Sequence, residues 1–223
     1  MDRFALFHEI VATRRSIRRW VNEPVPRTHL EQILDCARLA PSDTNAQPWH
    51  FTVVTDRALI QELERLTQAR FGQLAETMLA RGRRDAARKL KVFEKYAAHF
   101  GTAPAVILIS GEPYDSRFMR EIFVEMLDEA GVAKLRQEES IKSTSLAAMN
   151  LLLGAHALGY GAVPMTGPVL AIAPQLKERL RVPDPFEPHL LIALGRPAGG
   201  QLPTVGRKSL EQITSWIEPE PEA

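Results

Sequence analysis

The sequence lacks several features that mark large protein classes. Its one cysteine, Cys36, cannot form an internal disulfide. Its formal net charge is only +1, too small for a general binder of nucleic acid or membrane surfaces. No basic-then-apolar leader opens the chain, and the longest apolar stretch, residues 146–165, is interrupted by Asn150 and His156, which favours a buried helix and strand over a bilayer span. These absences favour a cytoplasmic protein.

Motifs of common cofactor and metal chemistry are missing too. Residues 159–164 begin as G-x-G, but they lack the third glycine and follow a helix, whereas a dinucleotide fingerprint follows a strand. At residues 8–12, HEIVA has Ala12 where a zinc-binding H-E-x-x-H motif has its second histidine. The sequence contains neither a Walker loop nor G-x-S-x-G. We therefore expect no metal site and no elbow-type serine hydrolase.

The spacing of apolar residues predicts a series of helices and strands. Thr28 and Glu31 are expected to form a capping box, Cys36 to be a small buried hydrophobe, and Gly159 to end its helix in a left-handed conformation. Residues 112–140 are polar and irregularly helical, which allows a mobile lid. Helical patterns cover residues 3–15, 28–41, 59–99 and 141–159, and strand patterns cover residues 50–56, 103–110, 160–167 and 189–195.

The overall pattern predicts the fold class. A chain of 223 residues that is 45% hydrophobic can bury a core as one domain over residues 1–223, with an acidic tail from about 217 to 223. Helices outnumber strands without strict βαβ alternation, which favours an α+β layered fold. The helix at 141–159 is apolar on nearly every face and has to be covered all round. One domain could do so, but we expect a homodimer in which a second copy covers it.

Residues 13–20, TRRSIRRW, concentrate four arginines around one serine. In an extended segment side chains alternate, so Arg14, Ser16 and Arg18 are expected on one side and Arg15 on the other. Two guanidinium groups beside a hydroxyl suit a terminal phosphate, because arginine pairs with phosphate oxygens through two N–H groups. A solvated charged run at a helix end is the alternative, and this segment alone does not decide between them.

A second polar stretch, APSDTNAQPWHF, occupies residues 40–51 after the second predicted helix. It combines small hydroxyl and amide side chains, Pro48 is expected to hold Gln47 in extended geometry, and Trp49 is expected to anchor the end of the loop. Such a loop offers hydrogen-bonding groups to the polar edge of a planar heterocycle. An ordinary turn rich in Asn, Ser and Pro is the alternative.

Together and in this order, the two stretches resemble the nitroreductase family of FMN-dependent oxidoreductases. The resemblance continues in GAVPMTGP at 161–168 and LGRPAGGQLPTVGRKSLEQI at 194–213, so it spans roughly residues 4–216. It implies an α+β fold with a central mixed, mostly antiparallel sheet flanked by helices, in an intertwined homodimer. It also implies that FMN binds tightly but non-covalently at the subunit interface.

The resemblance further implies which residues hold the flavin. A basic and hydroxyl group would bind the phosphate and ribityl chain, and a polar loop would come from the partner subunit. A backbone turn would lie beside flavin N5, and a C-terminal basic pair would complete the phosphate site. The residues at the phosphate and ribityl chain are Arg14, Arg15, Ser16 and Arg18. The loop from the partner subunit consists of Pro41, Ser42, Asp43, Thr44, Asn45 and Gln47. The turn beside N5 consists of Pro164, Met165, Thr166 and Gly167, and the C-terminal pair is Arg207 and Lys208.

Two positions depart from the family pattern. Asp43 stands where relatives often have a second serine, and Thr166 stands where some relatives have an acidic residue. A backbone N–H beside N5 survives the change at Thr166, whereas a role for that side chain does not follow. The family also has a flavin contact in the segment before residue 103, and no motif in this sequence matches it.

The implied chemistry needs no protein nucleophile, because the flavin takes a hydride at N5 from NAD(P)H and passes electrons to a second substrate in the same place. It predicts ping-pong kinetics with nitroaromatic compounds, quinones or similar small aromatic acceptors. Reductive dehalogenation of a phenol and oxidative breakdown of flavin are alternative activities of the same fold. A non-catalytic flavin-binding protein is a further alternative, whereas the near-neutral charge disfavours a nucleic-acid binder.

Overall fold

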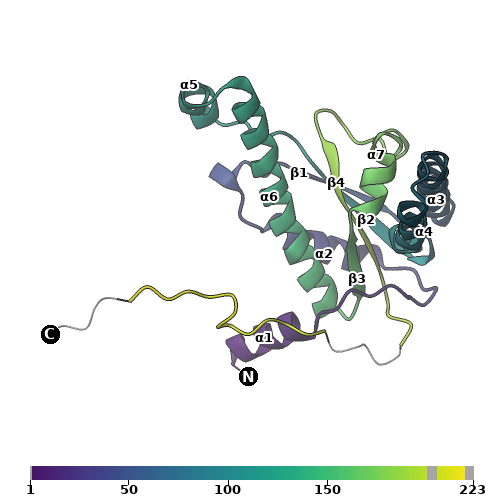
Figure 1. Cartoon of the computed structure of the whole chain (residues 1–223). Helices are drawn as coiled ribbons and strands as arrows, with labels where there is room; N and C mark the ends of the chain where they lie inside the picture. Colours follow the sequence, from purple (N-terminus) through teal and green to yellow (C-terminus); the bar gives the residue numbers. More distant parts are fainter. Residues whose placement is uncertain (1, 200–204, 219–223) are drawn as a thin grey trace.

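The computed structural model describes residues 2–199 and 205–218, and an antiparallel sheet lies at its centre (Figure 1). Its strands are β1 (Trp49–Val54), β2 (Ala105–Gly111), β3 (Gly161–Met165) and β4 (Glu187–Gly195), in the spatial order β1-β2-β4-β3. The helices are α1 (Arg3–Thr13), α2 (Arg27–Arg38), α3 (Arg57–Ala80), α4 (Arg84–Ala97), α5 (Val124–Met126), α6 (Glu129–Ala157) and α7 (Gly167–Arg179). Short 3₁₀ turns lie at Asp43–Asn45 and His99–Thr102, and a π-helical turn lies at Met119–Phe123.

Helices cover both faces of the sheet (Figure 1). α3 and α7 lie on one face, with α4 packed on α3, and α2 and α6 lie on the other. Successive side chains of β2 point to opposite faces of the sheet. Val106 and Leu108 pack under α3 and α7, whereas Ile107 and Ile109 pack under α2 and α6. All four are fully buried, which explains the uninterrupted apolar run of this strand in the sequence.

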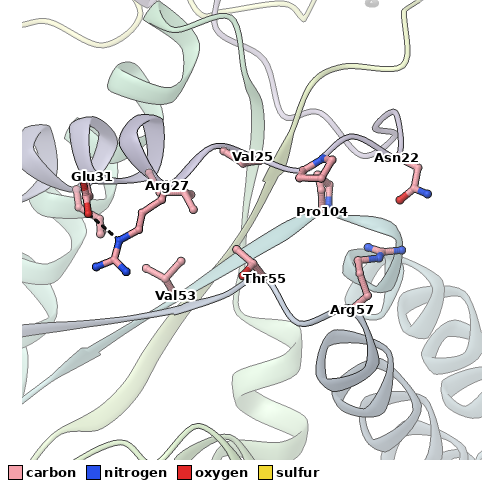
Figure 2. Close-up of a pocket in the computed structure, with 11 residues that line it drawn as sticks. Asn22, Val25, Arg27, Glu31, Val53, Thr55, Arg57 and Pro104 are labelled. Atoms are coloured by element: carbon pink, nitrogen blue, oxygen red, sulfur yellow. Dashed lines mark hydrogen bonds and ion pairs between the residues drawn. The ribbon is translucent and has the colours of Figure 1, made fainter.

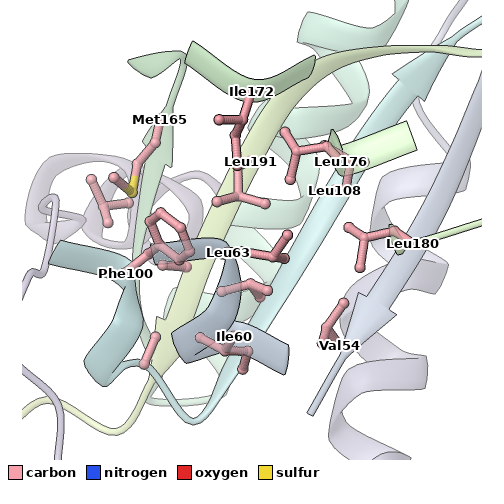
Figure 3. Close-up of a cluster of buried hydrophobic side chains, with 14 of the residues drawn as sticks. Val54, Ile60, Leu63, Phe100, Leu108, Met165, Ile172, Leu176, Leu180 and Leu191 are labelled. Carbon is pink, nitrogen blue, oxygen red and sulfur yellow. The ribbon is translucent and has the colours of Figure 1, made fainter. Parts of the chain in front are cut away.

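The cluster under α3 and α7 also receives the end of β3 (Figure 3). Met165 lies in it with Phe100 and with Leu63 from α3. Ile172 and Leu176 from α7 close the other side. The turn that follows β3 is therefore held by apolar packing on its inner side.

The predicted fold class is confirmed: the chain is α+β, with helices on both sides of an antiparallel sheet. In the described residues the parallel pairing is limited to an isolated bridge between Ser16 and Ala162. Every predicted strand is present with its ends shifted by a few residues. Gly159 takes the left-handed conformation after α6, with φ of 79°, as predicted.

The predicted helical stretch at 59–99 is not one helix. Gly82 adopts φ of 72° just after α3, and α4 begins at Arg84. Helix α7 was not predicted, because its sequence carries a proline in the first turn and Pro174 inside, and Ile172 departs from helical geometry at a kink. These glycine and proline positions disrupt the pattern from which the helices were predicted.

Two local predictions around α2 are wrong. The helix begins at Arg27 behind Pro26, so Thr28 lies inside it, and no side chain caps its start. Glu31 pairs with Arg27 at 2.8 Å, one turn away, instead of completing a capping box. Cys36 is exposed rather than buried, because Ile33 and Ala37 form the buried side of α2 and Cys36 lies outside it, at the edge next to Gly154 of α6.

The stretch at 112–140 is only partly irregular. It contains the π-helical turn and α5, but Asp128 caps α6 by accepting a hydrogen bond from the backbone N–H of Gly131 at 2.8 Å, so residues 129–140 belong to that long helix. A lid in this region stays a prediction.

Among the described residues, no helix is both long enough and apolar enough to span a membrane.

The arginine-rich segment crosses beside β3. Ile17 donates its backbone N–H to the carbonyl of Ala162 at 3.2 Å, and Trp20 donates its indole N–H to the carbonyl of Gly161 at 2.8 Å. A Cβ at position 161 would lie 2.4 Å from Cγ1 and 2.5 Å from Cβ of Ile17. Glycine is therefore required for the segment to lie this close to the strand.

We predict that Gly161→Ala lowers the free energy of unfolding by about 1–3 kcal/mol, because the added methyl group overlaps Ile17 and forces the crossing segment away from β3. Gly72→Ala is the matched control. It lies inside α3, where an added Cβ meets no atom within 4 Å, so it should raise stability by about 0.5–1 kcal/mol. Urea unfolding at one protein concentration measures the free energy of unfolding of both variants. If the two substitutions change it equally, the close packing of Gly161 against Ile17 is contradicted.

Candidate functional site

Two arginines far apart in the sequence meet at the end of α1. The pKa of Arg14 is lowered, first by burial and then by the positive charges of Arg15 and Arg207, so both of these residues lie near it. Figure 1 shows the C-terminal segment passing α1. Arg207 is exposed, as is Lys208 beside it. The predicted meeting of the N-terminal and C-terminal basic residues therefore agrees with the position of Arg207.

No carboxylate neutralises this cluster within the described residues. Twelve ion pairs form elsewhere, and none involves Arg14, Arg18 or Arg207. Positive charges gathered without a counter-ion repel one another, and the repulsion is stronger where burial reduces screening by water. The cluster is therefore suited to an anionic ligand.

Arg15 differs from its neighbours. Its guanidinium donates hydrogen bonds to the carbonyls of Ala12 at 2.6 Å and Arg14 at 2.8 Å, at the end of α1. A cation at this place satisfies carbonyl groups that the helix leaves free and complements the negative end of the helix dipole. Arg15 therefore has a structural role that its sequence pattern did not indicate.

A small pocket joins the arginine-rich segment to the turn after β3. It has a volume of about 170 Å³ and brings Arg18 together with Pro164, Met165, Thr166 and Gly167. Ser16 reaches the same strand through its bridge to Ala162. The four residues that are predicted to lie beside flavin N5 thus line one pocket together with Arg18, which is predicted to bind the phosphate or ribityl chain.

The first turn of α7 makes this pocket electropositive. Thr166 precedes the helix without a side-chain cap bond, so the backbone N–H groups of Gly167 and Val169 stay available, whereas Pro168 has none. The positive end of the helix dipole adds to the charge of Arg18. A Cβ at Gly167 would lie 2.6 Å from that of Ala97, so glycine is needed for the turn to pack against α4. The pocket favours an electron-rich or anionic group.

Aromatic residues that the sequence reasoning missed line the same pocket. Phe93, Tyr96 and His99 lie in the segment before β2, the region where the resemblance implies a flavin contact that no motif indicated. They recur three residues apart at the end of a helical pattern, which is typical of a packed helix face, so the sequence offered no signal of ligand binding. Only the fold brings these three residues together at the turn after β3.

His99 has a defined hydrogen-bonding state. Its Nδ1 lies 2.5 Å from the carbonyl oxygen of Tyr96, which can only accept, so Nδ1 carries the proton. Burial lowers the pKa of His99, and the charge of Arg18 lowers it further. Nε2 is buried and has no hydrogen-bond partner in the described part of the chain. The neutral ring therefore offers an unused acceptor within this pocket.

The loop at 41–47 has a strained backbone. Thr44, Asn45 and Gln47 have positive φ angles of 47°, 56° and 50°, a region that residues other than glycine enter at an energetic cost. The predicted extended geometry of Gln47 is therefore wrong. Ser42 causes the difference, because its Oγ accepts the backbone N–H of Gln47 at 2.9 Å and closes the loop. Such strain is typical of binding sites.

Within one chain, this loop lies away from the arginine cluster. Thr44 contacts the hydroxyl of Tyr114 at 3.2 Å, and the charge of Asp43 acts on Lys142 in α6. The arginine cluster acts instead on His156, near the far end of the same helix. Fourteen residues of helix separate Lys142 from His156, a distance of about 21 Å at 1.5 Å per residue. The loop therefore does not complete the cluster of its own chain.

A larger pocket, of about 640 Å³, lies between the start of α2 and β1 and contains none of the predicted site residues (Figure 2). Its charged groups are already engaged: Arg27 pairs with Glu31, and Arg57 donates to the carbonyl of Ala103. Its size alone does not make it the functional site, because it contains none of the residues of the arginine cluster. Among the described residues, no group of three or more His, Cys, Asp or Glu side chains is placed to hold a metal ion.

Solved structures with the same fold come from several bacteria. A BluB-like flavoprotein from Clostridium difficile 630 superposes with a TM-score of 0.84 at 23% identity, covering 95% of this chain and 98% of that one. A nitroreductase with bound FMN from Bacteroides fragilis NCTC 9343 has a TM-score of 0.69 at 21% identity, with coverage of 95% and 98%. At these identities the likeness concerns the fold.

Sequence comparison identifies the family. An NADH dehydrogenase from Thermus thermophilus is 30% identical over 91% of this chain and 92% of its own length, and iodotyrosine deiodinase 1 from Rattus norvegicus is 28% identical over 93% and 68%. A model of the Nitroreductase family matches residues 11–196. With a match over most of its length and a sheet of the same fold, the chain belongs to the nitroreductase family.

Proposed function

We propose that the chain is a single FMN-binding domain, spanning residues 1–223, of an NAD(P)H-dependent oxidoreductase that reduces small aromatic acceptors. The observation that carries the proposal is an arginine cluster that has no acidic partner in the described part of the chain, next to a pocket at the positive end of α7. FMN combines a phosphate with a ring that becomes electron-rich on reduction, so its two ends match these two features. Family membership and the FMN bound to the nitroreductase from Bacteroides fragilis support the same choice.

Each part of the chain would have a distinct task. Bound FMN supplies hydride exchange at N5, first with NAD(P)H and then with the acceptor. Arg14 and Arg207 would hold the phosphate, and Ser16 would donate its hydroxyl to the phosphate or ribityl chain. The first turn of α7 would present N–H groups to the ring, and Arg18 would stabilise negative charge there. No side chain needs to act as a nucleophile.

The site would be completed by a second copy of the chain. The pocket of about 170 Å³ is smaller than the 300–1,000 Å³ usual for small-molecule sites. The strained loop at 41–47 lies about 20 Å along α6 from its own chain's arginines. In a homodimer the loop of one subunit can reach the pocket of the other. We therefore assign Pro41, Ser42, Asp43, Thr44, Asn45 and Gln47 to the partner's FMN.

Exposed apolar side chains support the homodimer. α1 buries none of its residues, and Phe4 and Phe7 are 70% and 57% exposed. Trp216 and Ile217, in a C-terminal segment that extends away from the sheet in Figure 1, are 80% and 100% exposed. An uncovered set of this size is unusual for a monomer. A second subunit packed on these surfaces and on α6 would bury them.

Reductive dehalogenation is the second candidate activity, because relatives named iodotyrosine deiodinase align over more than nine-tenths of this chain. Both activities would use the same flavin and differ in the acceptor. The full-length protein should be mixed anaerobically with NADH or NADPH, and the loss of flavin absorbance followed. Nitrobenzoate, a quinone and a halogenated phenol are then added separately. Reoxidation of the flavin by nitrobenzoate or the quinone supports the proposed reductase activity. Reoxidation by the halogenated phenol with release of halide favours dehalogenation. If neither NADH nor NADPH bleaches the flavin, both activities are contradicted.

We predict that Arg14→Ala weakens FMN binding by at least about tenfold, because it removes a half-buried charge from the phosphate site. Arg19→Ala is the matched control, since Arg19 lies in the same segment, is exposed, and is absent from the predicted site. Equilibrium dialysis with FMN measures both affinities. If the two variants bind equally well, Arg14 does not hold the phosphate.

We also predict that the protein sediments as a dimer and that Met149→Glu, on the exposed side of α6, shifts it to monomers. Met149 is 47% exposed, and a carboxylate there would be buried without a partner in the dimer. Leu79→Glu is the control, because Leu79 is 46% exposed but lies on α3, across the sheet from α6. Analytical ultracentrifugation distinguishes the outcomes. The monomeric variant should also lose FMN, and a monomer that keeps FMN would contradict the shared site.

A further inference from the structure

A second polar pocket lies apart from the proposed flavin site. It has a volume of about 340 Å³ and forms where β2 ends and β4 begins, against the first half of α6. None of its lining residues belongs to the set assigned to FMN. Arg136 and Ser140 from α6 form one wall, and His189 from β4 forms another.

Two hydrogen-bonding groups of this pocket are buried without partners. Ser140 is 1% exposed, and its Oγ makes no hydrogen bond within the described part of the chain. The Nε of Arg136 is likewise buried and unpartnered there. Leaving such donors unsatisfied destabilises a folded protein, and most are satisfied by protein, water or ligand. A ligand that brings acceptor oxygens would satisfy both.

The charges around the pocket favour an anion. Asp115 accepts from Arg120 at 2.6 Å and from Arg136 at 3.3 Å, so two cations share one carboxylate. On the opposite wall, Glu187 pairs with Lys177 at 2.5 Å, which reduces its repulsion of a negative ligand. Lys177 also pairs with Asp184 at 2.9 Å, so among the described residues the surplus positive charge lies only on the Arg136 side of the pocket, beside the unpartnered donors.

A bulge directs His189 to this wall. The pairing of β2 with β4 shifts between Ile109 and Ser110, which leaves His189 opposite the irregularity. A Cβ at Gly111 would lie 2.4 Å from Cε1 of His189 and 2.5 Å from Oγ of Ser140. Glycine at position 111 therefore creates the space in which the imidazole and the hydroxyl lie side by side.

The protonation of His189 follows from its neighbours. The hydroxyl of Thr144 donates its one proton to the carbonyl of Ser140 at 2.9 Å, so it accepts from Nδ1 of His189 at 3.1 Å. Burial lowers the pKa of His189, which keeps the ring neutral. Nε2 is then an acceptor for a hydroxyl or water next to the anion.

We infer that this pocket binds a small organic carboxylate. Arg136 and Ser140 donate hydrogen bonds to the carboxylate oxygens, and Pro113 and Ala133 offer apolar surface to the carbon body. The volume lies at the lower end of the range for small-molecule sites, which fits a ligand of the size of benzoate. The inference does not depend on the proposed flavin chemistry.

Isothermal titration calorimetry with benzoate, using the full chain with FMN present, tests the inference. Saturable binding to the unmodified protein is expected, with no binding of the neutral analogue benzamide. Arg136→Gln should weaken benzoate binding by about tenfold or more, because it removes the charge that faces the ligand. Asp115 keeps its pair with Arg120 in this variant, so the fold has no new unpaired buried charge.

Arg120→Gln is the matched control, because Arg120 shares Asp115 but does not line the pocket. It should weaken benzoate binding less than Arg136→Gln does, because it removes the shared positive charge but no donor that lines the pocket. Ser140→Ala should weaken benzoate binding severalfold without lowering the melting temperature, because the hydroxyl has no partner within the described residues. Absent benzoate binding, binding unchanged by Arg136→Gln, or binding of inorganic phosphate in preference to benzoate would each overturn the inference.

Discussion

The crossing of the arginine-rich segment beside β3 is the contact on which the rest of the site depends. The backbone of Ile17 and the indole of Trp20 bond to adjacent carbonyls of one short strand, and Gly161 permits the close approach. Charged residues on both sides of these anchors are thereby held at fixed positions. Because the anchors are apolar or uncharged, the arginines need no acidic partners to keep their place.

In the proposed homodimer the site is divided between two subunits. One chain would supply the arginine cluster, which lies near His156 at the C-terminal end of α6, together with the first turn of α7 and His99 beside Arg18. The strained loop at 41–47 lies towards the other end of the same helix. A two-fold axis across α6 would bring each loop to the other chain's pocket, which accounts for the exposed apolar surfaces and for the incomplete pocket together.

The sequence predicted the fold class and the strands, because these follow from periodicity and from ordered motifs. It did not predict the kinked helix α7, whose prolines hide the helical pattern, or the exposed Cys36, whose position depends on how α2 packs. The contribution of His99 was also hidden, since its unpartnered nitrogen results from packing between α4 and β3. The left-handed Gln47 depends on a hydrogen bond across five residues, which no local rule anticipates.

The ratio of the affinities for FMN and riboflavin tests the central claim most directly, because the two ligands differ only in the phosphate. If unpaired arginines hold that phosphate, fluorescence titration of the cofactor-free protein should show FMN binding tighter by about a hundredfold or more, with a difference that shrinks as salt is raised. Equal affinities at low salt would mean that the cluster faces solvent and serves another purpose.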